Sequence, residues 1–282
     1  MTRLAIVSDI HGNHVAFEAV VEHIATQNID EVIVAGDLVG RGPQGSRVIE
    51  HVKRLGWETI RGNHEDYILG FLRREVPENW WHEDVWAASR WMAAEASAHE
   101  DYIDSLPLNT VRPGLHILHG SPRSINEGIG KWTSIEDRRA FVEAVEEPIL
   151  VCAHTHRTMN MDVDGRKIVN VGSVGMPFNG NWKAQYAIFD DEGDRWEVTF
   201  PEVEYDREVF YDIYDSSGFL KEGKITARLL KMEVEAARPF LVPFLRWIGA
   251  SGLEPVQSNL ETFLRDYNPE DPLRLKARPA GM

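Results

Sequence analysis

The sequence predicts an α/β sandwich with mixed β-sheets, a helical insertion and a helical C-terminal extension. Over the first 65 residues, short runs rich in β-branched residues alternate with stretches of helical period. Strand-like runs return between residues 115 and 200, whereas residues 66–106 and the chain after residue 204 are helical in pattern. These three observations predict a first domain over residues 1–204 and an extension over residues 205–282.

The first three predicted strands cover residues 4–9, 31–37 and 58–63, and helical patterns follow the first two. A strand, helix, strand order favours parallel pairing through right-handed crossovers, with both faces of the sheet covered. Ligands of such sheets bind beyond the carboxyl ends of the strands. The polar residues that follow these strands are therefore expected at one shared edge.

Later strands are predicted at residues 115–120, 149–154, 167–173, 185–190 and 195–200. Turn-forming Gly and Asp residues separate the last four, which predicts a second, largely antiparallel sheet. The insertion at 66–106 contains four tryptophans, Trp80, Trp81, Trp86 and Trp91. Apolar residues at helical spacing favour packing of the insertion onto the sandwich, and an aromatic cap that stacks a flat substrate group is the alternative.

Composition and charge limit the classes of function and the compartment. The formal net charge of -15 opposes binding to duplex nucleic acid, because that affinity comes mainly from Lys and Arg at phosphates. The apolar run at residues 240–248 contains Pro243 and Arg246 and is far shorter than the ~20 residues of a membrane span. Cys152 is the only cysteine, so no internal disulfide forms and a reducing, cytoplasmic location is expected.

Candidate metal ligands follow the first strand. Asp9 and His11 are two positions apart, and in an extended chain such residues project to the same side. Both side chains are therefore predicted to reach one metal ion. A helix-capping Asp9 with a surface His11 is the alternative.

The next two strands end in residues suited to metal and phosphate binding. Asp37 can bridge two cations with its two oxygens, and Arg41 offers a planar fork suited to phosphate. Asn63 supplies a neutral oxygen ligand, and His64 can donate a proton or a hydrogen bond to a leaving oxygen.

Three further histidines, His119, His154 and His156, follow later strands. Neutral imidazoles are good ligands for Zn, Mn, Fe and similar ions. Each residue taken alone also fits a turn or a half-buried histidine, but five strand ends that all carry ligand-type residues favour a metal centre.

These motifs resemble those of the calcineurin-like metallophosphoesterases. They read SDIHG from Ser8, GDLVGRG from Gly36, GNHE from Gly62, HGS from His119 and AHTH from Ala153. The segment NVGSVGMP from Asn170 resembles a segment found in the bacterial phosphodiesterase branch. Arg41, in contrast, is a feature similar to the phosphoprotein phosphatases and diadenosine tetraphosphatases. Gly40 stands where the protein phosphatases carry a second Asp, so the carboxylate that orients Arg41 or His64 is either missing or supplied elsewhere.

The resemblance implies a four-layer αββα sandwich with two metal ions. Asp9, His11 and His156 would hold the first ion, and Asn63, His119 and His154 the second. Asp37 would bridge the two ions, and His64 and Arg41 would contact the phosphate. Mn is the expected metal, with Fe, Zn, Ni or Co as alternatives.

The predicted function is hydrolysis of small phosphodiesters or phosphomonoesters, nucleotides among them, by in-line attack of a metal-bridging hydroxide. Alternatives are a dinucleoside polyphosphate hydrolase, a protein phosphatase and a catalytically silent scaffold. The partner is thus a small phosphorylated molecule rather than duplex nucleic acid or a membrane. The extension after residue 204 is expected to be a subunit contact or a lid.

Overall fold

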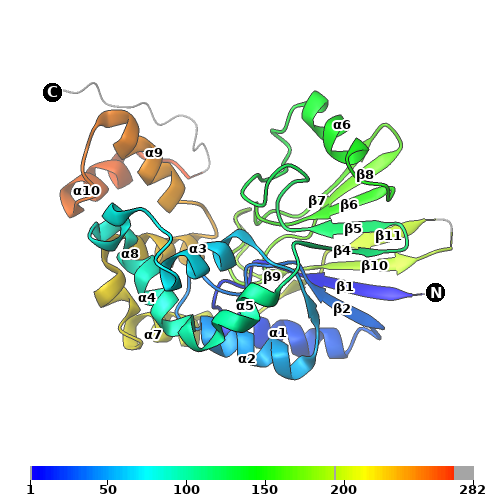
Figure 1. Cartoon of the computed structure of the whole chain (residues 1–282), viewed down its shortest axis with the longest axis horizontal. Helices are drawn as coiled ribbons and strands as arrows, with labels where there is room; N and C mark the ends of the chain where they lie inside the picture. The colour runs from blue at the N-terminus through cyan, green and yellow to red at the C-terminus, as the bar shows by residue number, and fades with distance from the viewer. Residues whose placement is uncertain (1, 194, 270–282) are drawn as a thin grey trace.

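The structure, a computed structural model, describes residues 2–193 and 195–269 (Figure 1). Strands and helices separate in space: the two main sheets pack together at one end of the molecule, and most helices gather at the other. The end of the predicted extension, residues 270–282, lies outside the described residues. The strand ends that carry the candidate site residues face the helical half.

The first sheet has the order β11-β10-β1-β2-β3. The bounds of its strands are β1 (Arg3–Val7), β2 (Glu31–Val34), β3 (Glu58–Thr59), β10 (Ala187–Asp191) and β11 (Trp196–Thr199). β1, β2 and β3 pair in parallel, as the alternation of strands and helices predicts. β10 and β11 add an antiparallel edge next to β1.

The second sheet has the order β4-β5-β6-β8-β7. The bounds of its strands are β4 (Asn109–Arg112), β5 (Leu115–Leu118), β6 (Ile149–Cys152), β7 (Met159–Val163) and β8 (Arg166–Asn170). β5, β6 and β8 pair in parallel, and β4 and β7 form antiparallel edges. A short ladder joins β9 (Ala184–Gln185) to β12 (Glu202–Val203).

The prediction of a second, largely antiparallel sheet is wrong. Two of its four strands, β6 and β8, pair in parallel, and the other two, β10 and β11, belong to the first sheet. The missed strand β7 is the reason. It reverses the chain between β6 and β8, so β8 returns beside β6 in the same direction.

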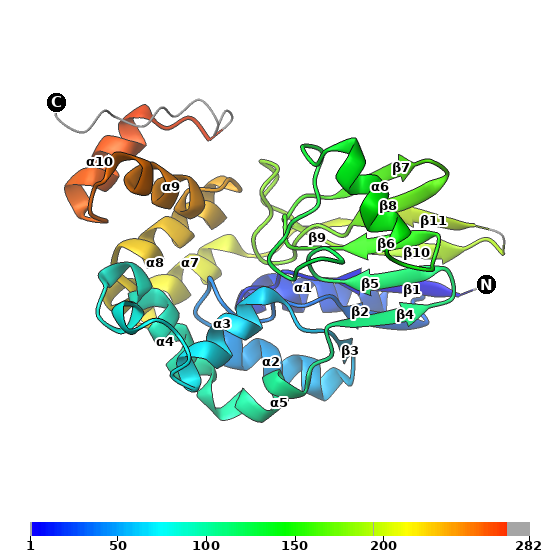
Figure 2. The same cartoon turned by 45° about the horizontal axis from the view of Figure 1, so that its top comes forward.

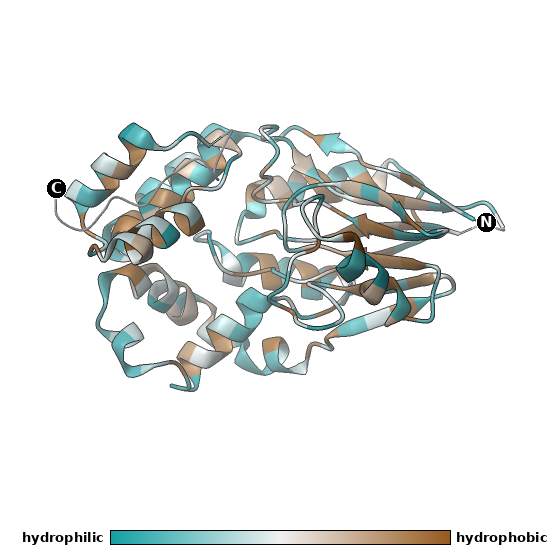
Figure 3. Ribbon diagram, turned by 90° about the horizontal axis from the view of Figure 1, so that it is seen from above, coloured by the Kyte–Doolittle hydropathy of each residue, from teal (hydrophilic) through white to brown (hydrophobic). Residues whose placement is uncertain are grey.

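The core confirms the four-layer arrangement. Leu4 and Ile6 of β1 pack between the two sheets, whereas Ala5 and Val7 face the helices, as the two-residue period of a strand requires. Two helices, α1 (His14–Ala25) and α2 (Gly45–Leu55), cover the outer face of the first sheet, and α6 (Ile135–Glu143) covers the second. Figure 3 shows the apolar strands gathered between these polar-faced layers. Cys152 is a core residue beneath α6.

The tryptophan-rich insertion is helical, and its tryptophans pack against each other and against the extension. Its elements are α3 (Asn63–Leu72), the 3-10 turns Glu78–Trp81, Asp84–Trp86 and Ser97–His99, α4 (Ala87–Ala96) and α5 (Glu100–Ser105). The rings of Trp80 and Trp86 stack with centroids 3.6 Å apart, and Trp91 packs on Phe219 at 4.9 Å. The main partner of α4 outside the insertion is thus α8 (Phe219–Ala236) of the extension, rather than the sandwich alone (Figure 2).

The described part of the extension, residues 205–269, contains four helices, α7 (Arg207–Ser216), α8 (Phe219–Ala236), α9 (Leu241–Ser251) and α10 (Gln257–Asp266). The side chain of Asp206 caps α7 by accepting from the N–H of Val209 at 3.2 Å. α9 and α10 share a separate apolar core with α8, around Phe244, Trp247 and Phe263. Among the described helices, none combines the length and the apolar character of a membrane span.

Candidate metal centre

The first candidate ligands lie in loops rather than on strands. β1 ends at Val7, and both Asp9 and His11 have a φ of 51°. The prediction that extended backbone brings these two side chains together is therefore wrong, because left-handed backbone does so. The same conformation recurs at Asp37, Arg41, His154 and His156. Each such residue costs about 1–2 kcal/mol, and strain of this kind gathers at functional sites.

Backbone contacts between neighbouring loops hold this conformation. The N–H groups of Asp9 and His11 donate to the carbonyls of Gly36 and Asp37, at 3.1 and 3.0 Å. The close approach requires glycine at position 62, where a Cβ atom would lie 2.2 Å from Asp37 Oδ1. The N–H of His64 donates to that same oxygen at 2.9 Å. The loops after β1, β2 and β3 therefore form one connected backbone unit.

A first group of ligand atoms surrounds one point at this edge. Asp9 Oδ1 lies 3.2 Å from His156 Nε2 and 3.6 Å from His11 Nε2. The two histidine Nε2 atoms are 3.1 Å apart, and Asp37 Oδ2 is 3.5 Å from His11 Nε2. All four side chains are buried.

A second group lies on the other side of Asp37. Asn63 Oδ1 is 3.0 Å from His119 Nε2 and 2.8 Å from His154 Nδ1. His119 Nε2 lies 3.4 Å from Asp37 Oδ2, the same oxygen that faces His11 in the first group. One carboxylate oxygen thus belongs to both groups.

The histidine tautomers suit a bound cation. The Nδ1 atoms of three histidines contact backbone carbonyls: His11 contacts Val39, His119 contacts Ala35 and His156 contacts Met176. A carbonyl only accepts, so each Nδ1 donates, and in the neutral ring the Nε2 lone pair is left free. The lone pairs of His11 and His156 then face each other, and Asp9 Oδ1 is buried without a hydrogen bond. A metal ion between these atoms would satisfy all of them.

The pKa shifts also indicate that the site favours positive charge beside Asp9 and Asp37. Burial opposes ionisation of Asp9 and Asp37, but the facing histidines hold both carboxyl pKa values well below their usual range. Burial lowers the pKa of His154 to about 4. Burial also disfavours a charged His119, yet Asp37 and Asp9 raise its pKa to about 10. In the metal-free chain a proton on His119 thus supplies part of the charge that a cation would bring.

Glu65 is a site residue that the sequence analysis did not single out. Its Oε2 accepts from the N–H groups of Gly62 and Asp37, at 2.7 and 2.8 Å. Its Oε1 accepts from Leu38 and Val39, at 2.9 and 3.2 Å. Burial and the charge of Asp37 raise the pKa of Glu65 to about 7, against the pull of these donors. An acidic residue at the third helical position of α3 is the sequence signal that points to such a role.

Arg41 and His64 lie beside the first group, at the mouth of the site. Arg41 Nε donates to His64 Nε2 at 3.3 Å, and Arg41 Nη1 contacts Glu233 Oε2 at 2.8 Å. Burial lowers the pKa of His64 well below its ordinary value, so the ring is neutral at pH 7. A Cβ atom at Gly40 would lie 2.2 Å from His64 Nδ1. No aspartate fits at Gly40, and the carboxylate beside Arg41 comes from α8 instead.

A cavity of about 400 Å³ opens over this edge, between the sandwich, the insertion and the extension. Its polar floor contains Asp37, Arg41, Asn63, His64, His154 and His156. Its walls are largely apolar and include Ile68, Trp86, Met92, Phe178, Leu241, Val242 and Leu245. The structure therefore brings all nine predicted site residues to one edge, with the seven candidate metal ligands in two groups and the other two beside the cavity.

Sequence and structure comparisons relate this chain to known proteins. Residues 2–194 match the family model of the calcineurin-like phosphoesterase superfamily domain. An uncharacterized protein of Methanocaldococcus jannaschii is 27% identical over 229 residues, which are 74% of this chain and 90% of that protein. A metallophosphoesterase structure from Sphaerobacter thermophilus is 29% identical, with a TM-score of 0.66, over 84% of this chain and 99% of the other.

A more limited likeness links the chain to an enzyme named for its substrate. A symmetrical bis(5'-nucleosyl)-tetraphosphatase of Baumannia cicadellinicola is 31% identical over 80 residues, which are 26% of this chain and 28% of that enzyme. The family match is much broader, since it covers every candidate ligand and all strands of the two main sheets except β11. The chain belongs to the calcineurin-like phosphoesterase superfamily.

Proposed function

We propose that the chain is a two-metal phosphoesterase that hydrolyses small phosphodiesters or phosphomonoesters. Asp9, His11 and His156 would hold one ion, and Asn63, His119 and His154 the other. The observation that carries the proposal is the position of Asp37 Oδ2, which faces His11 at 3.5 Å and His119 at 3.4 Å. Mn is the first candidate, with Fe, Zn, Ni or Co as alternatives, because mixed oxygen and nitrogen donors suit all of them.

Two bound ions supply Lewis-acid activation of water and of the phosphoryl oxygens. The protein supplies the rest. Arg41 lines the cavity, and its guanidinium can pair with phosphate oxygens. The neutral His64 ring lies against Arg41, and it would hydrogen bond a substrate oxygen beside the phosphate that Arg41 holds. No side chain is required as the nucleophile.

The cavity supports a small substrate with a flat or apolar group. Its volume of about 400 Å³ is at the lower end of the roughly 300–1,000 Å³ of small-molecule sites. Trp86 and Phe178 in its walls suit an aromatic group such as a nucleobase. These features disfavour a protein phosphatase, whose substrate would have to enter between the helices of the insertion and of the extension.

A dinucleoside polyphosphate hydrolase is the second candidate. The 80-residue likeness to the tetraphosphatase supports it, as does the combination of Arg41 with an aromatic wall. The phosphate chain of such a substrate would cross the metal edge, with one base against the apolar wall.

An assay panel tests these candidates. Purified protein with added Mn is given bis-p-nitrophenyl phosphate, p-nitrophenyl phosphate and diadenosine tetraphosphate. Turnover of either nitrophenyl ester supports the first candidate, and preferential turnover of diadenosine tetraphosphate supports the second. Absence of turnover with all three, in protein that still binds Mn, would overturn both and favour a catalytically silent scaffold.

A further inference from the structure

Arg41 has an unusual partner for a residue at the mouth of the site. Its Nη1 lies 2.8 Å from Oε2 of Glu233, which is near the end of α8 and 192 positions later in the chain. The Glu233 side chain is 1% exposed and the Arg41 side chain 13% exposed. Both side chains line the cavity. A carboxylate in such a position would repel a phosphate if Arg41 did not neutralise it.

The carboxylate of Glu233 is itself fixed by the backbone. Its second oxygen, Oε1, accepts from the N–H groups of Phe240 and Leu241, at 2.7 and 2.8 Å. These two residues begin α9, so Glu233 joins α8 to α9 with one oxygen and holds Arg41 with the other. The position of the guanidinium is thereby tied to the joint between two helices of the extension.

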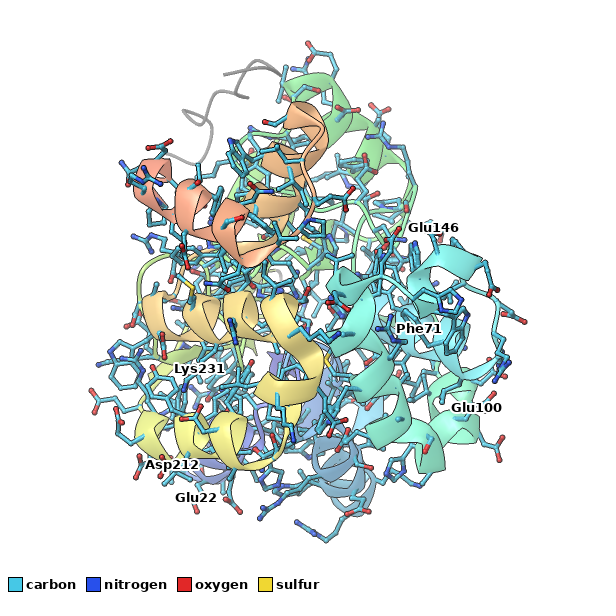
Figure 4. The ribbon with its side chains drawn as sticks, turned by 90° about the vertical axis from the view of Figure 1, so that its left-hand side faces the viewer. Glu22, Phe71, Glu100, Glu146, Asp212 and Lys231 are labelled. Atoms are coloured by element: carbon cyan, nitrogen blue, oxygen red, sulfur yellow. The ribbon has the colours of Figure 1, made fainter. Side chains whose placement is uncertain are left out.

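The backbone of Arg41 is held from the extension as well. The hydroxyl of Tyr214, on α7, donates to the carbonyl of Arg41 at 2.7 Å. Arg41 has a φ of 62°, a conformation that a surrounding structure must enforce. Figure 4 shows α7 and α8 side by side, with Asp212 labelled on the former and Lys231 on the latter. Two adjacent helices therefore hold one arginine at both its backbone and its side chain.

We propose that Glu233 is the positioning residue for Arg41, so that the C-terminal extension completes the phosphate-binding side of the site. The proposal rests on the proposed phosphoesterase function. A free arginine side chain samples many rotamers, and fixing its planar fork before the substrate arrives places the charge where it develops in the transition state. The loop of Arg41 cannot supply a carboxylate at Gly40, because His64 occupies that space.

The substitution Glu233→Gln tests the proposal. Glutamine keeps an oxygen that accepts from Phe240 and Leu241, but it removes the charge that holds Arg41. We expect kcat for the best ester of the panel to fall about tenfold or more. KM should stay unchanged or fall, because the Glu233 carboxylate no longer neutralises the positive charge of Arg41. Glu235→Gln is the matched control, since Glu235 is exposed on the same helix. It should stay within twofold of the wild type.

A second measurement separates positioning from general damage and needs no bound metal. In EDTA-treated protein, inorganic phosphate is titrated and followed by ³¹P NMR. Glu233→Gln should bind phosphate as well as or better than the wild type, and Arg41→Gln should bind it at least threefold more weakly. In the Arg41→Gln background, Glu233→Gln should change kcat by less than twofold.

Several outcomes would overturn the proposal: a kcat within twofold of the wild type for Glu233→Gln, a raised KM with unchanged kcat, or an unchanged effect of Glu233→Gln when Arg41 is already glutamine. If Glu233→Gln lacks a cooperative unfolding transition, Glu233→Asp replaces it. That variant keeps the charge one methylene further away and should lose at least threefold in kcat without a rise in KM. An inactive wild type would instead overturn the proposed phosphoesterase function.

Discussion

The loops at the edge of the sandwich and the helical wall of the cavity build their parts of the site in opposite ways. The candidate metal ligands lie within a few residues of strand ends, and their loops are hydrogen bonded to each other. The helical wall takes single residues from distant helices, such as Trp86 from the insertion and Glu233 and Val242 from the extension. In the proposed function the sandwich therefore supplies the chemistry, whereas the helices hold Arg41 and line the cavity for the substrate.

Loss of Asp37 should have the largest effect, because its Oδ2 faces both ligand groups. Asp37→Asn keeps the shape but removes the charge shared by the two groups. We expect the rate of bis-p-nitrophenyl phosphate hydrolysis to fall more than about 100-fold. Loss of a residue that only supports a metal ligand already costs about 10–100-fold in metal affinity or activity. Metal content by mass spectrometry should fall in parallel. Full metal content with normal turnover would show that the two groups do not act as one centre.

Metal should stabilise the sandwich edge against unfolding. With Mn at 100 times its Kd, binding to the native state alone contributes about 2.7 kcal/mol. The melting temperature of EDTA-treated protein should therefore rise on addition of Mn, and that of Asp37→Asn should rise much less. Equal shifts in both proteins would place the bound Mn away from this edge.

Metal affinity should depend on pH through His119. The pKa of His119 in the metal-free chain is raised to about 10, so at pH 7 a cation must displace its proton. That proton contributes to the stability of the metal-free fold at low pH, and the contribution is lost as pH rises toward 10. Apparent Mn affinity should accordingly rise about tenfold per pH unit between pH 6 and 8, measured by calorimetry in matched buffers. A flat profile would contradict this assignment.

The helical wall should give the smallest effect. Val242 lines the cavity and is 39% exposed, whereas Val209 on α7 is 46% exposed and does not line it. Val242→Ser should raise KM for bis-p-nitrophenyl phosphate a few-fold, because loss of one partly buried apolar contact costs about 1 kcal/mol. Val209→Ser is the control and should leave KM unchanged. Equal effects of the two substitutions on KM would show that the helical wall does not contribute to substrate selection.

The sequence predicted the parallel strands and the four layers more accurately than the way the nine candidate residues meet. Asp9 and His11 were predicted to converge through extended backbone, but both have positive φ. The missed strand β7 led to a wrong second sheet, because turn residues mark where strands end and not which sheet they join. Glu65 escaped notice because its four backbone donors come from segments about 25 residues apart in the chain.

The chemistry of the site was present in the sequence itself, since ligand-type residues after short apolar strands gather at one sheet edge whatever covers it. The position of Arg41 was decided only by the tertiary structure. Gly40 shows that a carboxylate is absent locally, but no local pattern indicates that Glu233 of α8 replaces it. Periodicity and spacing report on contacts within one element, whereas a single buried ion pair between a loop and a distant helix depends on how that helix packs on the loop.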